Sequence, residues 1–114
     1  MTVKELKLLL TKINKGEKFR YNTKTNFQKK IIQLLVEDEV IAIKAEVITP
    51  TRKINFEIFS KQIIVKRKNY HKWITKFLKA QLTQTMIITT NCGLMSHREA
   101  IEKRIGGFII GYYY

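Results

Sequence analysis

The chain has 114 residues, of which 45 % are hydrophobic, enough apolar surface for the core of one small domain or of two lobes. Its 22 lysines and arginines exceed its 9 acidic residues and give a net charge of +13, so a polyanion is the expected partner, nucleic acid before an anionic membrane. No apolar run reaches the roughly 18 residues that span a bilayer. The single cysteine, Cys92, excludes an internal disulfide, and with only His71 and His97 beside it no metal site or cofactor is predicted.

The chain begins with a predicted helix–strand–helix pattern. Apolar residues at helical spacing predict an amphipathic helix over 3–14, and a short strand is expected over 18–22. Thr25 and Gln28 have the spacing of a capping box, in which each side chain bonds the backbone amide of the other residue. A second helix is therefore predicted over 26–37.

Two strand patterns complete the first half of the chain. Residues 40–47 alternate between apolar and polar side chains, which predicts one strand whose buried face consists of Ile41, Ile43, Ala45 and Val47. The alternation returns after Pro50 and predicts another strand at Ile54, Phe56 and Ile58. The first half is thus expected to be an α/β lobe.

The second half is predicted to contain more strand than helix. Strands are expected over 62–66, 84–90 and 108–113, and helices over 70–79 and 96–104. Ser96 and Glu99 have capping-box spacing at the start of the last helix, and Gly106-Gly107 ends it. The predicted fold class is α+β, with two abutting small lobes: an N-terminal α/β lobe over 1–60 and a C-terminal, mainly β lobe with short helices over 61–114.

The charge is not evenly spread along the chain, because one long stretch of the second half lacks acidic residues. Between Ile58 and Arg98 the sequence contains no aspartate or glutamate. Within this stretch, lysines four, four and three residues apart would share one helix face, namely Lys68, Lys72, Lys76 and Lys79. A lysine stripe is often only a solvated surface. Here no nearby acid offsets the repulsion, so a face that follows RNA phosphates is the favoured interpretation.

The most informative motif runs from Thr89 to Ser96, with the sequence Thr-Thr-Asn-Cys-Gly-Leu-Met-Ser, and precedes a short helix, Gly106-Gly107 and an aromatic strand. It resembles the Ser-Thr-Ser-x-Gly-x-Met-Thr signature of small-subunit ribosomal protein eight of the bacterial and organellar type. Further similarities to this family are Leu10-Thr11-Lys12-Ile13, Thr25 and Ser60-Lys61. Gln62-Ile63 departs from the family, which has Pro-Gly at that place.

The resemblance implies two lobes that grip a central-domain stem of the small-subunit ribosomal RNA, beside neighbouring ribosomal proteins, without catalysis, a cofactor or a small-molecule substrate. Short polar groups and glycine suit the shallow groove of RNA, where 2′-hydroxyls and base edges are accessible. Structural roles are also open: Ser96 can cap a helix and still contact RNA, Gly93 can serve a turn, and Met95 is expected in the core rather than at a ligand. The predicted RNA-binding residues are Lys12, Thr25, Lys61, Lys68, Lys72, Lys76, Thr89, Thr90, Asn91, Gly93, Ser96 and Arg98.

Two other functions and several locations remain open at this stage. A freestanding RNA chaperone would act through charge alone, and a small ribonuclease would use His71 and His97 as general acid and base. The 17 isoleucines and 17 lysines, against five glycines and one proline, indicate an A/T-rich genome. Together with the eroded family motifs, this bias predicts a mitochondrial ribosome, with a plastid or a bacterial cytoplasm as alternatives. No membrane partner is expected.

Overall fold

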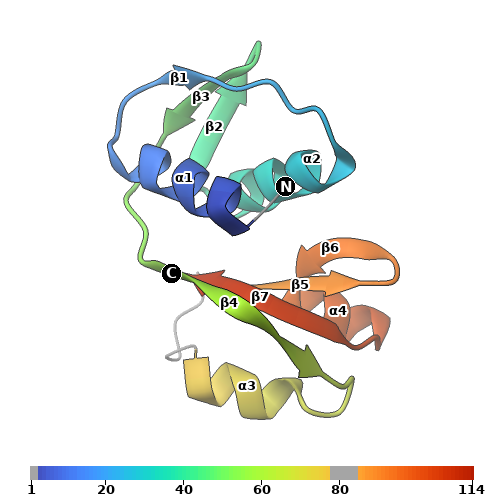
Figure 1. The fold of residues 1–114 in the computed structure, drawn as a ribbon. Coiled ribbons are helices and arrows are strands. Elements are labelled where there is room, and N and C mark those ends of the chain that lie inside the picture. Colours follow the sequence, from blue (N-terminus) through green and yellow to red (C-terminus); the bar gives the residue numbers. More distant parts are fainter. Residues whose placement is uncertain (1–2, 78–84) are drawn as a thin grey trace. The chain divides into compact units, whose positions relative to one another are not determined.

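The computed structural model describes residues 3–77 and 85–114, in helices and antiparallel sheets of an α+β fold (Figure 1). The chain divides into two compact units, Met1–Ile54 and Asn55–Tyr114. The predicted boundary after residue 60 lies inside a strand of the second unit, so the division precedes the predicted one. The reason is that residues 56–65 form one strand, which pairs with the last strand at both of its ends and therefore belongs to the sheet of the second unit.

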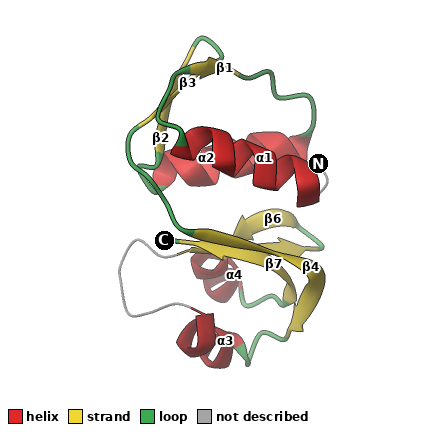
Figure 2. Ribbon diagram, turned by 60° about the vertical axis from the view of Figure 1, so that its left-hand side comes forward, coloured by secondary structure: helices red, strands yellow, loops and turns green. Residues whose placement is uncertain are grey.

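The first unit is a three-stranded sheet with two helices. Its elements are α1 (Val3–Asn14), β1 (Phe19–Arg20), α2 (Asn26–Glu37), β2 (Ile41–Lys44) and β3 (Val47–Pro50). The strands pair antiparallel in the order β1-β3-β2, and both helices lie on the same side of this sheet (Figures 1 and 2). The core contains the fully buried Leu6, Leu10, Ile13, Ile31, Leu35 and Ile48. These are the apolar stripes of the two helices and the inner face of β3.

Both predicted helices of the first unit are confirmed. The Thr25 hydroxyl accepts a hydrogen bond from the Gln28 amide at 3.2 Å, and the Gln28 side-chain oxygen accepts one from the Thr25 amide at 3.3 Å. The capping box is therefore complete. At the other end of the unit, the Asn14 side chain both donates to the carbonyl and accepts from the amide of Ile54, each at 2.8 Å, which fixes the C-terminus of α1 to the chain leaving the unit.

The single strand predicted over 40–47 is wrong. The chain reverses at Ala45 and Glu46, whose φ angles are +51° and +66°, and β2 and β3 form a hairpin in which Lys44 pairs with Val47. The predicted apolar face is broken by this turn, and Ile43 is 41 % exposed. The turn residues Ala-Glu are not of the Asn-Gly type that marks a two-residue hairpin turn. The alternation of apolar and polar residues therefore predicted one continuous strand.

The second unit is a four-stranded antiparallel sheet whose elements are β4 (Phe56–Val65), α3 (Tyr70–Phe77), β5 (Thr85–Thr90), β6 (Gly93–Ser96), α4 (His97–Lys103) and β7 (Gly107–Tyr113). The strand order is β4-β7-β5-β6, and α3 and α4 lie on one face of the sheet (Figure 2). Tyr70 of α3 and Ala100 of α4 join the buried cluster on that face, with Val65, Met86, Ile88, Met95 and Ile109.

Several predictions for the second unit need correction. The strands predicted over 54–58 and 62–66 are one strand, β4, whose pairing with β7 is irregular between Ile58 and Ile63. β6 was not predicted, because its buried residues stand in the segment interpreted as a loop. Helix 70–79 is confirmed as far as Phe77, and its last two residues lie outside the described part. Met95 is buried, which confirms its interpretation as a core residue, and Tyr113 of the last strand is buried as well.

Candidate nucleic-acid interface

Two turns of the second unit lie at the same end of its sheet. β7 runs between β4 and β5, and its start pairs with the end of β4 through Gly107 and Val65 and with β5 through Phe108 and Thr89. The basic turn that follows β4 and the polar turn that joins β5 to β6 therefore flank the start of β7. We call residues 66–68, 89–93 and 106–108 together the sheet-end surface.

Glycines form the middle of the sheet-end surface for a steric reason. A Cβ atom on Gly106 would lie 2.6 Å from the Val65 carbonyl oxygen and 3.2 Å from the Arg67 amide nitrogen. A Cβ atom on Gly107 would collide with the Thr89 carbonyl oxygen. Since these neighbours are backbone atoms, no side chain can move aside to make room. Glycine is thus required at both positions by the close packing of the backbone between the two turns.

The Thr90 hydroxyl closes the β5–β6 turn. It accepts a hydrogen bond from the Cys92 amide at 3.0 Å and donates one to the Gly93 carbonyl at 2.9 Å. Gly93 has a φ of +103°, so the interpretation of this glycine as a turn residue is confirmed. A hydroxyl has one donor and two acceptor positions, so the Thr90 oxygen retains one acceptor position. Asn91 and Cys92 at the tip are exposed.

A cross-strand row beside this turn was missed by the sequence analysis. Ile64 of β4 and Thr89 of β5 both pair with Phe108 of β7, and paired residues point to the same face of a sheet. Ile64 is 67 % and Phe108 42 % exposed. Within the described residues the Thr89 hydroxyl is buried without a hydrogen-bond partner. In the sequence, this row is indicated only by Phe108, an aromatic residue directly after Gly106-Gly107.

The lysines of α3 are held against an aromatic ring. The ammonium nitrogens of Lys72 and Lys76 each lie 5.3 Å from the centroid of the Trp73 ring, within the range of a cation–π contact. Trp73 in turn stacks on Phe77 with centroids 5.7 Å apart. Lys68 lies in the turn that leads into α3 and is exposed. The predicted helix face is therefore present for Lys72 and Lys76 only, because Lys68 precedes the helix and Lys79 lies outside the described residues.

Two of the predicted contacts lie at the other end of the β5–β6 hairpin. Ser96 pairs with Ile87 and is 6 % exposed, and its hydroxyl accepts from the Glu99 amide at 3.2 Å as the N-cap of α4. The Arg98 guanidinium donates to the Thr85 hydroxyl at 2.9 Å. The Glu99 carboxylate pairs with Lys103 at 3.1 Å. The signature residues thus divide between the turn and the opposite end of the hairpin.

The remaining predicted contacts are exposed but lie outside the sheet-end surface. Lys61 stands in the irregular part of β4. Lys12 and Thr25 belong to the first unit, where the Lys12 ammonium lies 4.9 Å from the centroid of the Phe19 ring and Thr25 caps α2. Their sequence resemblance alone still supports a contact with RNA, so their role stays a prediction.

The two histidines lie in different elements and in different environments. His97 is 6 % exposed, and its Nδ1 accepts a hydrogen bond from the Met86 amide at 3.1 Å, which identifies it as part of the fold. His71 is exposed in the first turn of α3. Among residues 3–77 and 85–114, no group of three potential ligands could hold a metal ion, and no helix is long and apolar enough to cross a bilayer.

Comparison with known proteins gives a family. The model of the family described as ribosomal protein S8 matches residues 2–114. Small ribosomal subunit protein uS8 of the archaeon Nitrosopumilus maritimus is 46 % identical over 50 residues, which are 44 % of this chain and 38 % of that protein. Protein uS8A of Schizosaccharomyces pombe is 37 % identical over 57 residues, 50 % of this chain and 44 % of that protein. The matched segments thus span about two fifths of these relatives.

Proposed function

Because the chain belongs to the ribosomal protein S8 family, we propose that it is a structural component of the small ribosomal subunit and binds small-subunit ribosomal RNA through its sheet-end surface. The family consists of structural proteins and not of enzymes, in agreement with the sequence prediction. The observation that supports the proposed contact is the pairing register of β7. It places the basic turn of residues 66–68 and the polar turn of residues 89–93 on either side of Gly106-Gly107, which we call the glycine strip.

Each part of this surface has a different task in the proposed complex. Lys66, Arg67 and Lys68 are exposed cations that neutralise phosphates, a contribution that sets affinity and orientation rather than sequence preference. The free acceptor position of Thr90 and the amide of Asn91 are short groups that reach 2′-hydroxyls and base edges. The exposed ring of Phe108 offers a face for stacking on an unpaired base.

The proposal is tested by titrating the purified full chain with a central-domain stem of small-subunit ribosomal RNA and with an unrelated stem of equal length. Neutralisation of about five to eight phosphates should give a slope of about −4 to −7 in a plot of log affinity against log salt. The central-domain stem should bind more tightly at moderate salt. Equal affinity for both stems would contradict the proposal and favour a chaperone that acts through charge alone.

We propose a mitochondrial ribosome as the location, on the evidence of composition. The excess of isoleucine and lysine is typical of an A/T-rich genome, whereas the archaeal and yeast relatives give no information about an organelle. Separation of mitochondrial from cytosolic ribosomes, followed by detection of a peptide of this chain, tests the location. Recovery in cytosolic small subunits alone would overturn it without affecting the proposed RNA contact.

A further inference from the structure

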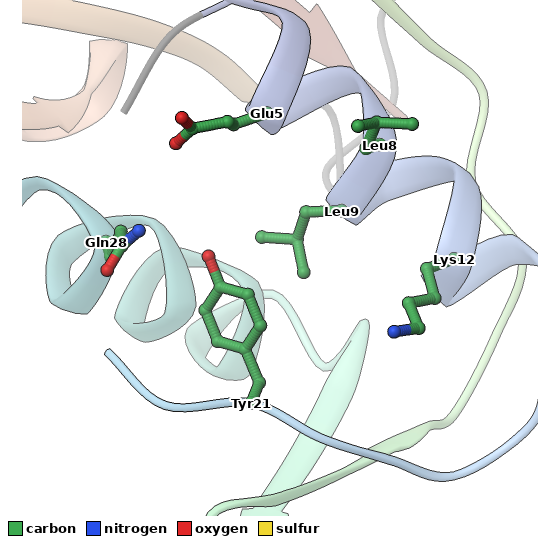
Figure 3. Close-up of a pocket in the computed structure, with 6 residues that line it drawn as sticks. All are labelled: Glu5, Leu8, Leu9, Lys12, Tyr21 and Gln28. Atoms are coloured by element: carbon green, nitrogen blue, oxygen red, sulfur yellow. The ribbon is translucent and has the colours of Figure 1, made fainter. Parts of the chain in front are cut away.

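A shallow groove in the first unit lies outside the sheet-end surface, although one of its lining residues, Lys12, is also a predicted RNA-binding residue. It has a volume of about 300 Å³ and lies between α1 and the chain that leads from β1 into α2 (Figure 3). Four residues of α1 line it together with Tyr21 and Gln28, and these four are Glu5, Leu8, Leu9 and Lys12. The Leu9 side chain and the Tyr21 hydroxyl both point into the space between the two helices.

The groove is apolar at its centre. Leu9 is 4 % exposed and forms part of the core, whereas Leu8, its neighbour, is 61 % exposed. An isolated exposed leucine is ordinary on a protein surface. Here, however, Leu8 stands at the rim of a hollow that the Leu9 side chain and the Tyr21 ring also line. An apolar side chain placed in this hollow would be in contact with all three.

Opposite charges flank this apolar centre along the helix. Glu5 and Lys12 are seven residues apart, which separates them by about 10 Å along the axis of α1. Burial, and secondly the negative charge of Glu5, raise the pKa of Tyr21 above its ordinary value. A ligand with an apolar group between a cation and an anion therefore matches the groove better than a phosphate does.

We propose that this groove receives an apolar side chain of a neighbouring small-subunit protein, on a segment with a basic residue toward Glu5 and an acidic residue toward Lys12. The inference rests on the proposed function, since it requires the chain to be assembled into the small subunit. An RNA base fits the groove less well. The Gln28 side-chain oxygen already accepts from the Lys24 amide at 2.6 Å and from the Thr25 amide, and the Glu5 carboxylate repels phosphates.

The first experiment replaces the exposed leucine by lysine. Leu8→Lys introduces a charge at the apolar rim, and Thr11→Lys is the matched control, because Thr11 is exposed on the same helix, outside the groove, and acquires the same charge. Small subunits assembled with each variant are analysed by quantitative mass spectrometry. With Leu8→Lys, the affinity of one neighbouring protein for the small subunit should fall about tenfold or more, so its occupancy should decrease. With Thr11→Lys, the occupancy of the same protein should be normal.

The second experiment identifies what occupies the groove. A benzophenone is attached to Leu8→Cys in a Cys92→Ser background, which removes the natural thiol, and assembled small subunits are irradiated. A cross-link to the same protein that Leu8→Lys displaces supports the proposal. A cross-link to ribosomal RNA, no cross-link, or equal losses with Leu8→Lys and Thr11→Lys would overturn it.

Failure of this inference can be distinguished from failure of the proposed function. Both lysine variants are titrated with the central-domain stem and with the unrelated stem in the absence of other proteins, and both should retain the preference of the unchanged chain for the central-domain stem. If the unchanged chain shows no preference for the stem and is absent from small subunits, the proposed function fails and this inference fails with it. If it is present and Leu8→Lys displaces no neighbour, only the groove is wrongly assigned.

Discussion

Within the described residues, β2–β3 and β5–β6 are hairpins that reverse the chain through two residues, and the two turns differ in sequence. In the first unit, β2 and β3 are joined by Ala45 and Glu46, and both residues adopt positive φ although neither is glycine. In the second unit, β5 and β6 are joined by Asn91 and Cys92, and the positive φ falls on Gly93. The second turn also has its own side-chain lock, the two hydrogen bonds of the Thr90 hydroxyl.

This difference favours the second hairpin as the one that takes part in the proposed RNA contact. The first turn accepts backbone strain of about 1 kcal/mol or more at each non-glycine residue with positive φ, and it carries the acidic Glu46 at its tip. The second avoids that strain, contains no acidic residue, and lies beside Gly107 at the start of β7. A rigid, locked turn of short polar groups suits recognition, because little ordering entropy is lost when it binds.

The largest effect is expected from Gly107→Val. The added Cβ would collide with the Thr89 carbonyl and separate β7 from β5, so the free energy of unfolding should fall by about 3 kcal/mol or more. Urea denaturation measures this loss. Gly16→Ala is the control, since no heavy atom lies within 4 Å of its Cβ position and only its φ of +79° is strained. A similar loss in both variants would contradict the steric argument.

The next effect concerns the lock of the second turn. Thr90→Val removes both hydrogen bonds of the hydroxyl and should lower the free energy of unfolding by about 1 to 2 kcal/mol. Binding to the central-domain stem should weaken as well, with an unchanged salt slope because no cation is lost. Thr90→Ser keeps the hydroxyl and should restore both quantities. Normal RNA affinity of Thr90→Val would show that the turn makes no RNA contact.

The α3 lysines lie in the part of the second unit that contains no acidic residue. Lys72→Gln together with Lys76→Gln should weaken binding to cognate and unrelated RNA alike by about tenfold, because phosphate contacts carry no sequence information. The salt slope should become shallower by about 2. Lys44→Gln with Lys53→Gln, two exposed lysines of the first unit, is the matched control and should leave the slope unchanged. Equal changes of affinity and salt slope in the two double variants would contradict a specific role of the α3 lysines in RNA binding.

The smallest effect is expected in the first turn. Ala45→Gly relieves the strain at a φ of +51°, and the gain is partly offset by the greater freedom of glycine in the unfolded chain. The free energy of unfolding should therefore rise by about 0.5 kcal/mol, measured by urea denaturation. Affinity for RNA should be unchanged. A loss of stability would mean that the positive φ at this turn is not a source of strain.

The sequence by itself determined the elements that depend on local chemistry. Both helices of the first unit, the capping box of Thr25 and Gln28, and the cap at Ser96 follow from side chains within one or two turns of each other. The family resemblance was also contained in short motifs, and the family match confirms it. The charge distribution needed no structure, because it is a property of composition along the chain.

Tertiary structure alone decided where these pieces meet. The turn at Ala45 and Glu46 has no turn signature, so only the pairing of β2 with β3 shows it. The union of two predicted strands in β4 depends on β7, which lies more than forty residues farther along the chain. The same long-range pairing places the basic turn, the glycine strip and Thr90 together and leaves Ser96 at the other end of its strand. Strand register couples residues distant in sequence, and local patterns contain no information about it.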